Sequence, residues 1–158
     1  MGDGGRNPGE VVGDVLRREY TPFVIREKVI PLIPVNWNQS YPWNASVTQI
    51  NGKCCPAGCT AIAVAQVLVS NYFRYGSIVG SIKGTRIDWP LINNSIKNPR
   101  LLDATEGRPE TLTPEAKAVS MMIYAIGVVL NMDYSLSGSS ASSAKTRDCL
   151  TYVLYKGV

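Results

Sequence analysis

A cysteine at the start of an apolar stretch is the residue in this chain best placed to do chemistry. Cys59 follows Gly58, and the residues after it are apolar on nearly every side of a helix, which predicts a buried helix from about residue 58 to 73. A helix N-terminus carries partial positive charge and free backbone N–H groups, and both favour a thiolate over a thiol. Cys59 is therefore a candidate nucleophile, the alternative being an ordinary packing cysteine.

A nucleophilic cysteine normally depends on a histidine that accepts its proton. This chain contains no histidine. The 158 residues therefore carry one part of such a site and lack another, and we expect them not to hydrolyse peptides by themselves.

The loop before the predicted helix supplies a second candidate. Residues 36–52 are rich in Asn, Pro, Ser and aromatic side chains, a composition typical of loops. Within this loop, the side-chain amide of Gln39 could donate a hydrogen bond to a developing oxyanion, with the backbone N–H of Cys59 as the second donor. The alternative interpretation of Gln39 is a solvated loop residue.

The three other cysteines permit different chemistry. Cys54 and Cys55 lie close before Cys59, whereas Cys149 stands far from all of them. Zinc sites typically combine two separated cysteine or histidine pairs, so the spacing favours neither a metal nor any other cofactor. Cys54 and Cys55 could form a disulfide, exchange with Cys59 or have no role, and a redox protein remains a third hypothesis for function.

Composition bounds the class of protein. A length of 158 residues is enough for one domain with a real core, and the net charge of +4 comes from scattered basic residues, which argues against a nucleic-acid partner. The longest apolar run, residues 121–130, is half the ~20 residues that a membrane helix needs. Residues 1–22 are expected to be a flexible arm or a remnant of a linker or propeptide, and residues 23–158 part of one domain.

The remaining pattern predicts a mixed α+β domain. Thr113 and Pro114 have the residue types of an N-cap and a first helical position, so a helix is expected from there to about Leu130. A further helix is expected over residues 142–155. Residues 23–35 are predicted to be extended, residues 74–112 irregular around a short anchored segment at 87–92, and residues 131–143 a serine-glycine loop.

Four segments together resemble the streptopain-type cysteine peptidases, which are bacterial papain-like enzymes. The segments are residues 37–44 (WNQSYPWN), 57–66 (AGCTAIAVAQ), 88–89 (DW) and 127–134 (GVVLNMDY), in the order that the family has them. The resemblance covers the chain from about residue 32 to its end. It implies a papain-like fold, mainly its helical N-terminal half, in which a buried central helix carries the cysteine.

The resemblance also implies roles for single residues. Cys59 matches the catalytic nucleophile and Gln39 the oxyanion-hole glutamine, while Gly138, Ser139 and Ser140 become candidate substrate contacts. The implied activity is a cysteine endopeptidase that acts on proteins or peptides and needs no cofactor. The implied localisation is secreted or periplasmic.

The chain departs from the family where the histidine is expected. The family's Gly-Gly-His segment and its Asn-Trp-Gly-Trp segment do not occur here. We therefore expect the chain to be the nucleophile-bearing half of a peptidase domain, with the C-terminal half of the same domain as its partner. The alternative is an inactive module that binds peptides or a partner through the same cleft.

Overall fold

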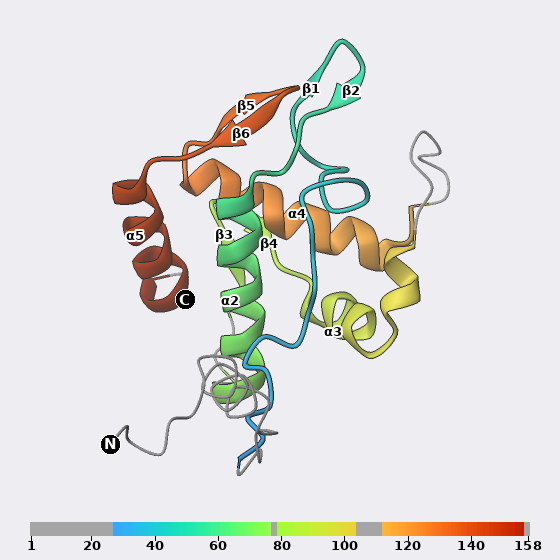
Figure 1. Cartoon of the computed structure of the whole chain (residues 1–158), viewed down its shortest axis with the longest axis vertical. Helices are drawn as coiled ribbons and strands as arrows, with labels where there is room; N and C mark the ends of the chain where they lie inside the picture. The colour runs from blue at the N-terminus through green and yellow to red at the C-terminus, as the bar shows by residue number, and fades with distance from the viewer. Residues whose placement is uncertain (1–26, 77–78, 104–111, 157–158) are drawn as a thin grey trace, which may run out of the picture. The chain divides into compact units, whose positions relative to one another are not determined.

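The computed structural model describes residues 27–76, 79–103 and 112–156 (Figure 1). The chain separates into two units, Met1–Ile30 and Pro31–Val158, and the elements below all belong to the second. The arm expected at residues 1–22 lies outside the described residues. Among those residues no helix has both the length and the apolar character needed to cross a membrane.

Helix α2 (Cys59–Tyr75) forms the centre of the second unit and confirms the predicted helix to within two residues at each end. Gly58 precedes it with a φ of 89°, and Gly76 ends it in the left-handed conformation, donating its N–H to the Tyr72 carbonyl. The helix is buried along much of its length because its apolar side chains face α4 and the surrounding loops, notably at Ala61, Ile62, Ala65, Leu68 and Val69.

Helix α4 (Pro114–Val129) packs against α2 and supplies much of the remaining core. Its predicted start is confirmed, because the Thr113 hydroxyl accepts a hydrogen bond from the Ala116 N–H at 3.1 Å and Pro114 takes the first helical position. The largest side chains that this helix buries completely are those of Val119, Met122, Ile123 and Ile126.

Helix α3 (Trp89–Lys97) shows that the expectation of irregular chain over residues 74–112 is wrong for this part. The Asp88 carboxylate caps the helix by accepting a hydrogen bond from the Leu91 N–H at 3.2 Å. The Trp89 indole N–H donates to the Val79 carbonyl at 2.9 Å, and its ring stacks on Tyr72. A 3-10 turn, η1 (Pro99–Leu102), follows α3.

The described residues include three antiparallel two-stranded hairpins: β1 (Gln49–Ile50) with β2 (Lys53–Cys54) before α2, β3 (Ser81–Ile82) with β4 (Thr85–Arg86) between α2 and α3, and β5 (Asp133–Ser135) with β6 (Gly138–Ser140) after α4. The first turns at Asn51 and Gly52, both with positive φ, as their residue types indicate. The third replaces the serine-glycine loop expected at residues 131–143. Of the segment expected to be extended at residues 23–35, residues 23–26 lie outside the described residues, and residues 27–35 form no strand.

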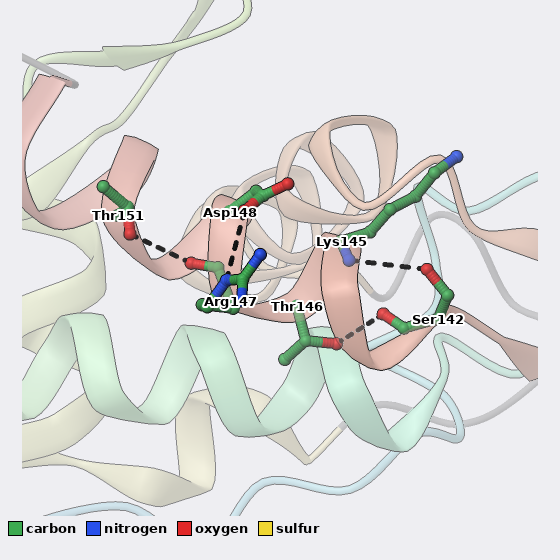
Figure 2. A network of polar contacts seen from close by, with 6 residues as sticks. All are labelled: Ser142, Lys145, Thr146, Arg147, Asp148 and Thr151. Carbon is green, nitrogen blue, oxygen red and sulfur yellow. Dashed lines mark hydrogen bonds and ion pairs between the residues drawn. The ribbon is translucent and has the colours of Figure 1, made fainter.

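Helix α5 (Ser143–Thr151) and a π-helical turn (Tyr152–Lys156) confirm the last predicted helix. Its polar side chains bond to its own backbone, as Figure 2 shows: the Ser142 hydroxyl accepts from the Lys145 N–H at 3.4 Å, and the Thr146 and Thr151 hydroxyls donate to backbone carbonyls four residues earlier. The buried residue of α5 is Cys149. Burial raises the pKa of the Cys149 thiol to about 11, so this thiol is neutral at physiological pH.

Gly127, near the end of α4, has no room for a side chain. A Cβ at this position would collide with the hydroxyl of Tyr134 on β5 and would lie 3.3 Å from the ring carbon that bears it. That hydroxyl is buried without a hydrogen-bond partner among the described residues. Burial, followed by the neighbouring Tyr124 and Cys55, raises the pKa of Tyr134 to about 12.

We therefore expect Gly127→Ala to destabilise the fold by about 1–3 kcal/mol through overpacking. The matched variant is Tyr134→Phe, which removes an unsatisfied hydroxyl and should cost little. Combining the two should recover most of the loss, as measured by urea unfolding of all four proteins. Strictly additive effects would contradict a direct collision between these two residues.

Candidate active site

Cys59 is the first residue of α2 and is exposed to solvent. It lines a cleft of about 760 Å³ between α2 and the C-terminal helical segment, and these two elements lie beside each other in Figure 1. The cleft is mainly apolar, with Arg147 as its charged side chain. Its other lining residues are Thr60, Ala63, Ala141, Ser143, Thr146, Leu150, Thr151, Leu154 and Tyr155.

The start of α2 is electrostatically suited to an anion. Its N-cap is Gly58, which has no side chain to accept a hydrogen bond from the first-turn N–H groups, and the first turn contains no acidic residue. The partial positive charge of the helix end is therefore not neutralised by the helix's own side chains. A thiolate or an oxyanion at this point would meet backbone donors.

Two hydrogen bonds attach the Gln39 loop to the cysteine segment. The Ala57 N–H donates to the Gln39 carbonyl at 2.9 Å, and the Gln66 side chain of α2 donates to the Trp37 carbonyl at 3.1 Å. The backbone of Gln39 is thus bonded to Ala57, two residues before Cys59 in the sequence. Gln39 is exposed to solvent. The structure brings these two predicted residues into one region.

Asn44 is a residue of this region whose role the sequence did not reveal. It is 6% exposed, and its side-chain amide donates to the Cys55 carbonyl at 3.0 Å. The Cys55 N–H in turn donates to the Thr48 carbonyl at 3.0 Å. The chain entering α2 is therefore held from the loop side. Asn44 stands in the quoted 37–44 motif, but its residue type there suggested only a loop.

The three candidate substrate contacts lie on β6, next to the start of α2 (Figure 1). Gly138 and Ser140 are exposed. Ser139 is half-buried, and its hydroxyl donates to the Pro56 carbonyl at 2.6 Å. The hairpin therefore touches the cysteine segment directly, through the middle residue of the three.

The four cysteines occupy different environments, and all are free thiols. Cys55 and Cys149 are buried, Cys54 is half-buried with the Gln49 amide nitrogen 3.6 Å from its sulfur, and Cys59 is exposed. Cys54 and Cys55 are not joined to each other. Of the four, Cys59 is the thiol that reagents reach most readily.

The structure thus has an exposed cysteine at the first residue of a buried helix, beside a loop whose glutamine backbone is bonded to the same segment. Residues 37–156 match the Peptidase C10 family, and the chain belongs to that family. A search of curated protein sequences finds no match.

Two solved structures share the fold. The active wild-type interpain A cysteine protease of Prevotella intermedia is 25% identical with a TM-score of 0.53, covering 75% of this chain and 52% of that one. A prointerpain A fragment from the same organism, with one cysteine replaced by alanine, is 23% identical with a TM-score of 0.54, covering 90% and 50%. The chain spans about half the length of these structures. The expected α+β, papain-like fold is confirmed.

Proposed function

We propose that this chain is the nucleophile-bearing half of a cysteine endopeptidase that cleaves peptide bonds in proteins. The observation that carries the proposal is the exposed Cys59 at the start of α2, where no side chain caps the helix. The loop that contains Gln39 is hydrogen-bonded to Ala57, two residues before Cys59. Membership of the Peptidase C10 family supports it. The proposed setting is outside the cytoplasm, secreted or periplasmic, with no cofactor.

In the proposed reaction the Cys59 sulfur attacks the scissile carbonyl carbon. The carbonyl oxygen becomes an oxyanion that accepts hydrogen bonds from the Cys59 N–H and the Gln39 amide. The C–N bond then breaks, the amine leaves with a proton, and the acyl group remains on sulfur until water hydrolyses the thioester. Gly138 and Ser140 on the exposed hairpin are the proposed contacts for substrate backbone.

This reaction needs a proton acceptor that the 158 residues do not supply, since they contain no histidine. We propose that a histidine-bearing C-terminal half of the same domain provides it and packs along α2. Cys59, Ala63 and Val67 lie on one face of the helix at a spacing of four residues, and all are exposed.

The same exposed face continues beyond the first cleft. A second cleft of about 350 Å³ is lined by Leu32, Val67 and Leu154, and Leu154 lines the first cleft as well. Side chains along this face include Leu32, 59% exposed, and Tyr155, 78% exposed. Polar side chains, among them Asn71, Arg74 and Arg147, also line the two clefts, but the exposed apolar side chains are typical of an interface that another folded part covers.

The proposal predicts stoichiometric acylation without turnover. An N-acyl amino acid p-nitrophenyl ester has a leaving group that needs no protonation, so Cys59 should release p-nitrophenolate in a burst of one equivalent per chain. Added imidazole should accelerate acylation of Cys59 by accepting the thiol proton, while a peptide substrate stays intact. Because imidazole itself cleaves p-nitrophenyl esters, acylation in its presence is followed as the mass of the acylated chain, with Cys59→Ala as the blank. Absence of any burst would refute the role of Cys59 as nucleophile. An acylation rate that imidazole does not change would favour the alternative of an inactive binding module.

A further inference from the structure

We propose that Ser139 is a positioning residue that holds the segment before Cys59, rather than a residue that contacts substrate. This inference rests on the proposed function and refines it. It assigns the hairpin β5–β6 a defined task, namely to fix where α2 begins. The start of α2 in turn sets the positions of the Cys59 thiol and of the N–H groups of the first helical turn.

The first support is the hydrogen bond from the Ser139 hydroxyl to the Pro56 carbonyl, at 2.6 Å. It joins residues 83 positions apart in sequence and spans from β6 to the chain three residues before Cys59. Because Pro56 lacks an N–H, its carbonyl is the polar backbone group that it offers for such attachment. The hydroxyl hydrogen used here is not available to a substrate carbonyl.

The second support is steric and involves the residue directly before Cys59. A Cβ at Gly58 would lie 2.9 Å from the Met132 methyl carbon and 3.4 Å from the Ser139 Cβ. Gly58 is buried, with a φ of 89° that other residues rarely adopt. The backbone at Gly58 is therefore packed, on the side where a side chain would project, against Met132 just before β5 and against Ser139 on β6.

The third support is that the residues on either side of Pro56 are held independently. The Gln39 carbonyl accepts from the Ala57 N–H, and the Asn44 amide donates to the Cys55 carbonyl. Consecutive residues 55, 56 and 57 are thus bonded in turn to the loop, the hairpin and the loop. Loss of the middle bond should leave the fold intact while allowing the segment to relax away from β6.

The test is the ester burst measured at increasing ester concentration for Ser139→Ala. A positioning role predicts a maximal acylation rate about tenfold lower, with the ester concentration at half-maximal rate unchanged. Ser139→Thr retains the hydroxyl and should restore most of the rate. Ser137→Ala, in the exposed turn of the same hairpin, is the matched control and should acylate like the parent chain.

Three results would overturn the inference. They are an unchanged maximal rate in Ser139→Ala, a rise confined to the half-saturating ester concentration, and a failure of Ser139→Thr to rescue a variant whose thermal unfolding is normal. If the parent chain shows no burst at all, the proposed function fails, and positioning is then read from iodoacetamide. Ser139→Ala should change the alkylation rate of Cys59 severalfold relative to Cys54 in the same molecule, and an unchanged ratio would also overturn the inference.

Discussion

Replacing Cys59 with alanine is expected to abolish the release of p-nitrophenolate, from one equivalent per chain to none. The reason is chemical: Cys59 is an exposed thiol, whereas Cys55 and Cys149 are buried. Exposure decides which sulfur can reach an ester carbonyl, and Cys59 stands at the start of α2, where backbone N–H groups are free to donate to an oxyanion. The measurement is the amplitude of the absorbance burst at a fixed concentration of folded chain.

Cys54→Ala is the matched control for this variant, because Cys54 precedes Cys59 by five residues and is half-buried. It should leave the burst amplitude unchanged. A burst that persists in Cys59→Ala and disappears in Cys54→Ala would reverse the assignment. It would support the thiol-exchange hypothesis instead of the peptidase.

Gln39→Ala is expected to slow acylation about 100-fold, which is the effect of removing one donor from an oxyanion hole. The proposed role of Gln39 is to donate a hydrogen bond to an oxygen that becomes negative in the transition state. The substitution removes the side-chain amide but keeps the backbone carbonyl of residue 39, so the hydrogen bond from the Ala57 N–H can persist. Stopped-flow measurement of the burst rate constant tests the prediction.

Alkylation with iodoacetamide separates this role from a general effect on the thiol. That reaction displaces iodide at a saturated carbon and forms no oxyanion, so Gln39→Ala should alkylate Cys59 at the parental rate. Equal slowing of acylation and alkylation would mean that Gln39 supports the local structure. No slowing of either would make Gln39 an ordinary solvated loop residue.

The two longest helices could be predicted because their signals are local. Thr113 caps the helix that begins at Pro114, so both residues of the signal are neighbours in sequence. The apolar residues after Cys59 predict a buried helix whichever element packs against it. The resemblance to streptopain-type peptidases then assigned the family correctly. These inferences need only neighbouring residues, or motifs in a fixed order.

The missed features depend on distant contacts. Helix α3 is only nine residues long, and its anchor is the Trp89 indole bonded to Val79 and stacked on Tyr72, neither of which a local pattern reveals. The hairpin β5–β6 contains no β-branched residue, so composition indicated a loop. The bonds of Ser139 to Pro56 and of Asn44 to Cys55 cross between elements and became visible only in three dimensions.

The position of the covalent adduct is the most direct test of the account. The chain is treated with the p-nitrophenyl ester, quenched in acid, digested and mapped by mass spectrometry, with each of the four cysteines quantified separately. The account predicts the acyl group on the peptide that contains Cys59, at close to one per chain. An acyl group spread evenly between Cys54 and Cys59 would contradict it, because no site would then distinguish the two sulfurs.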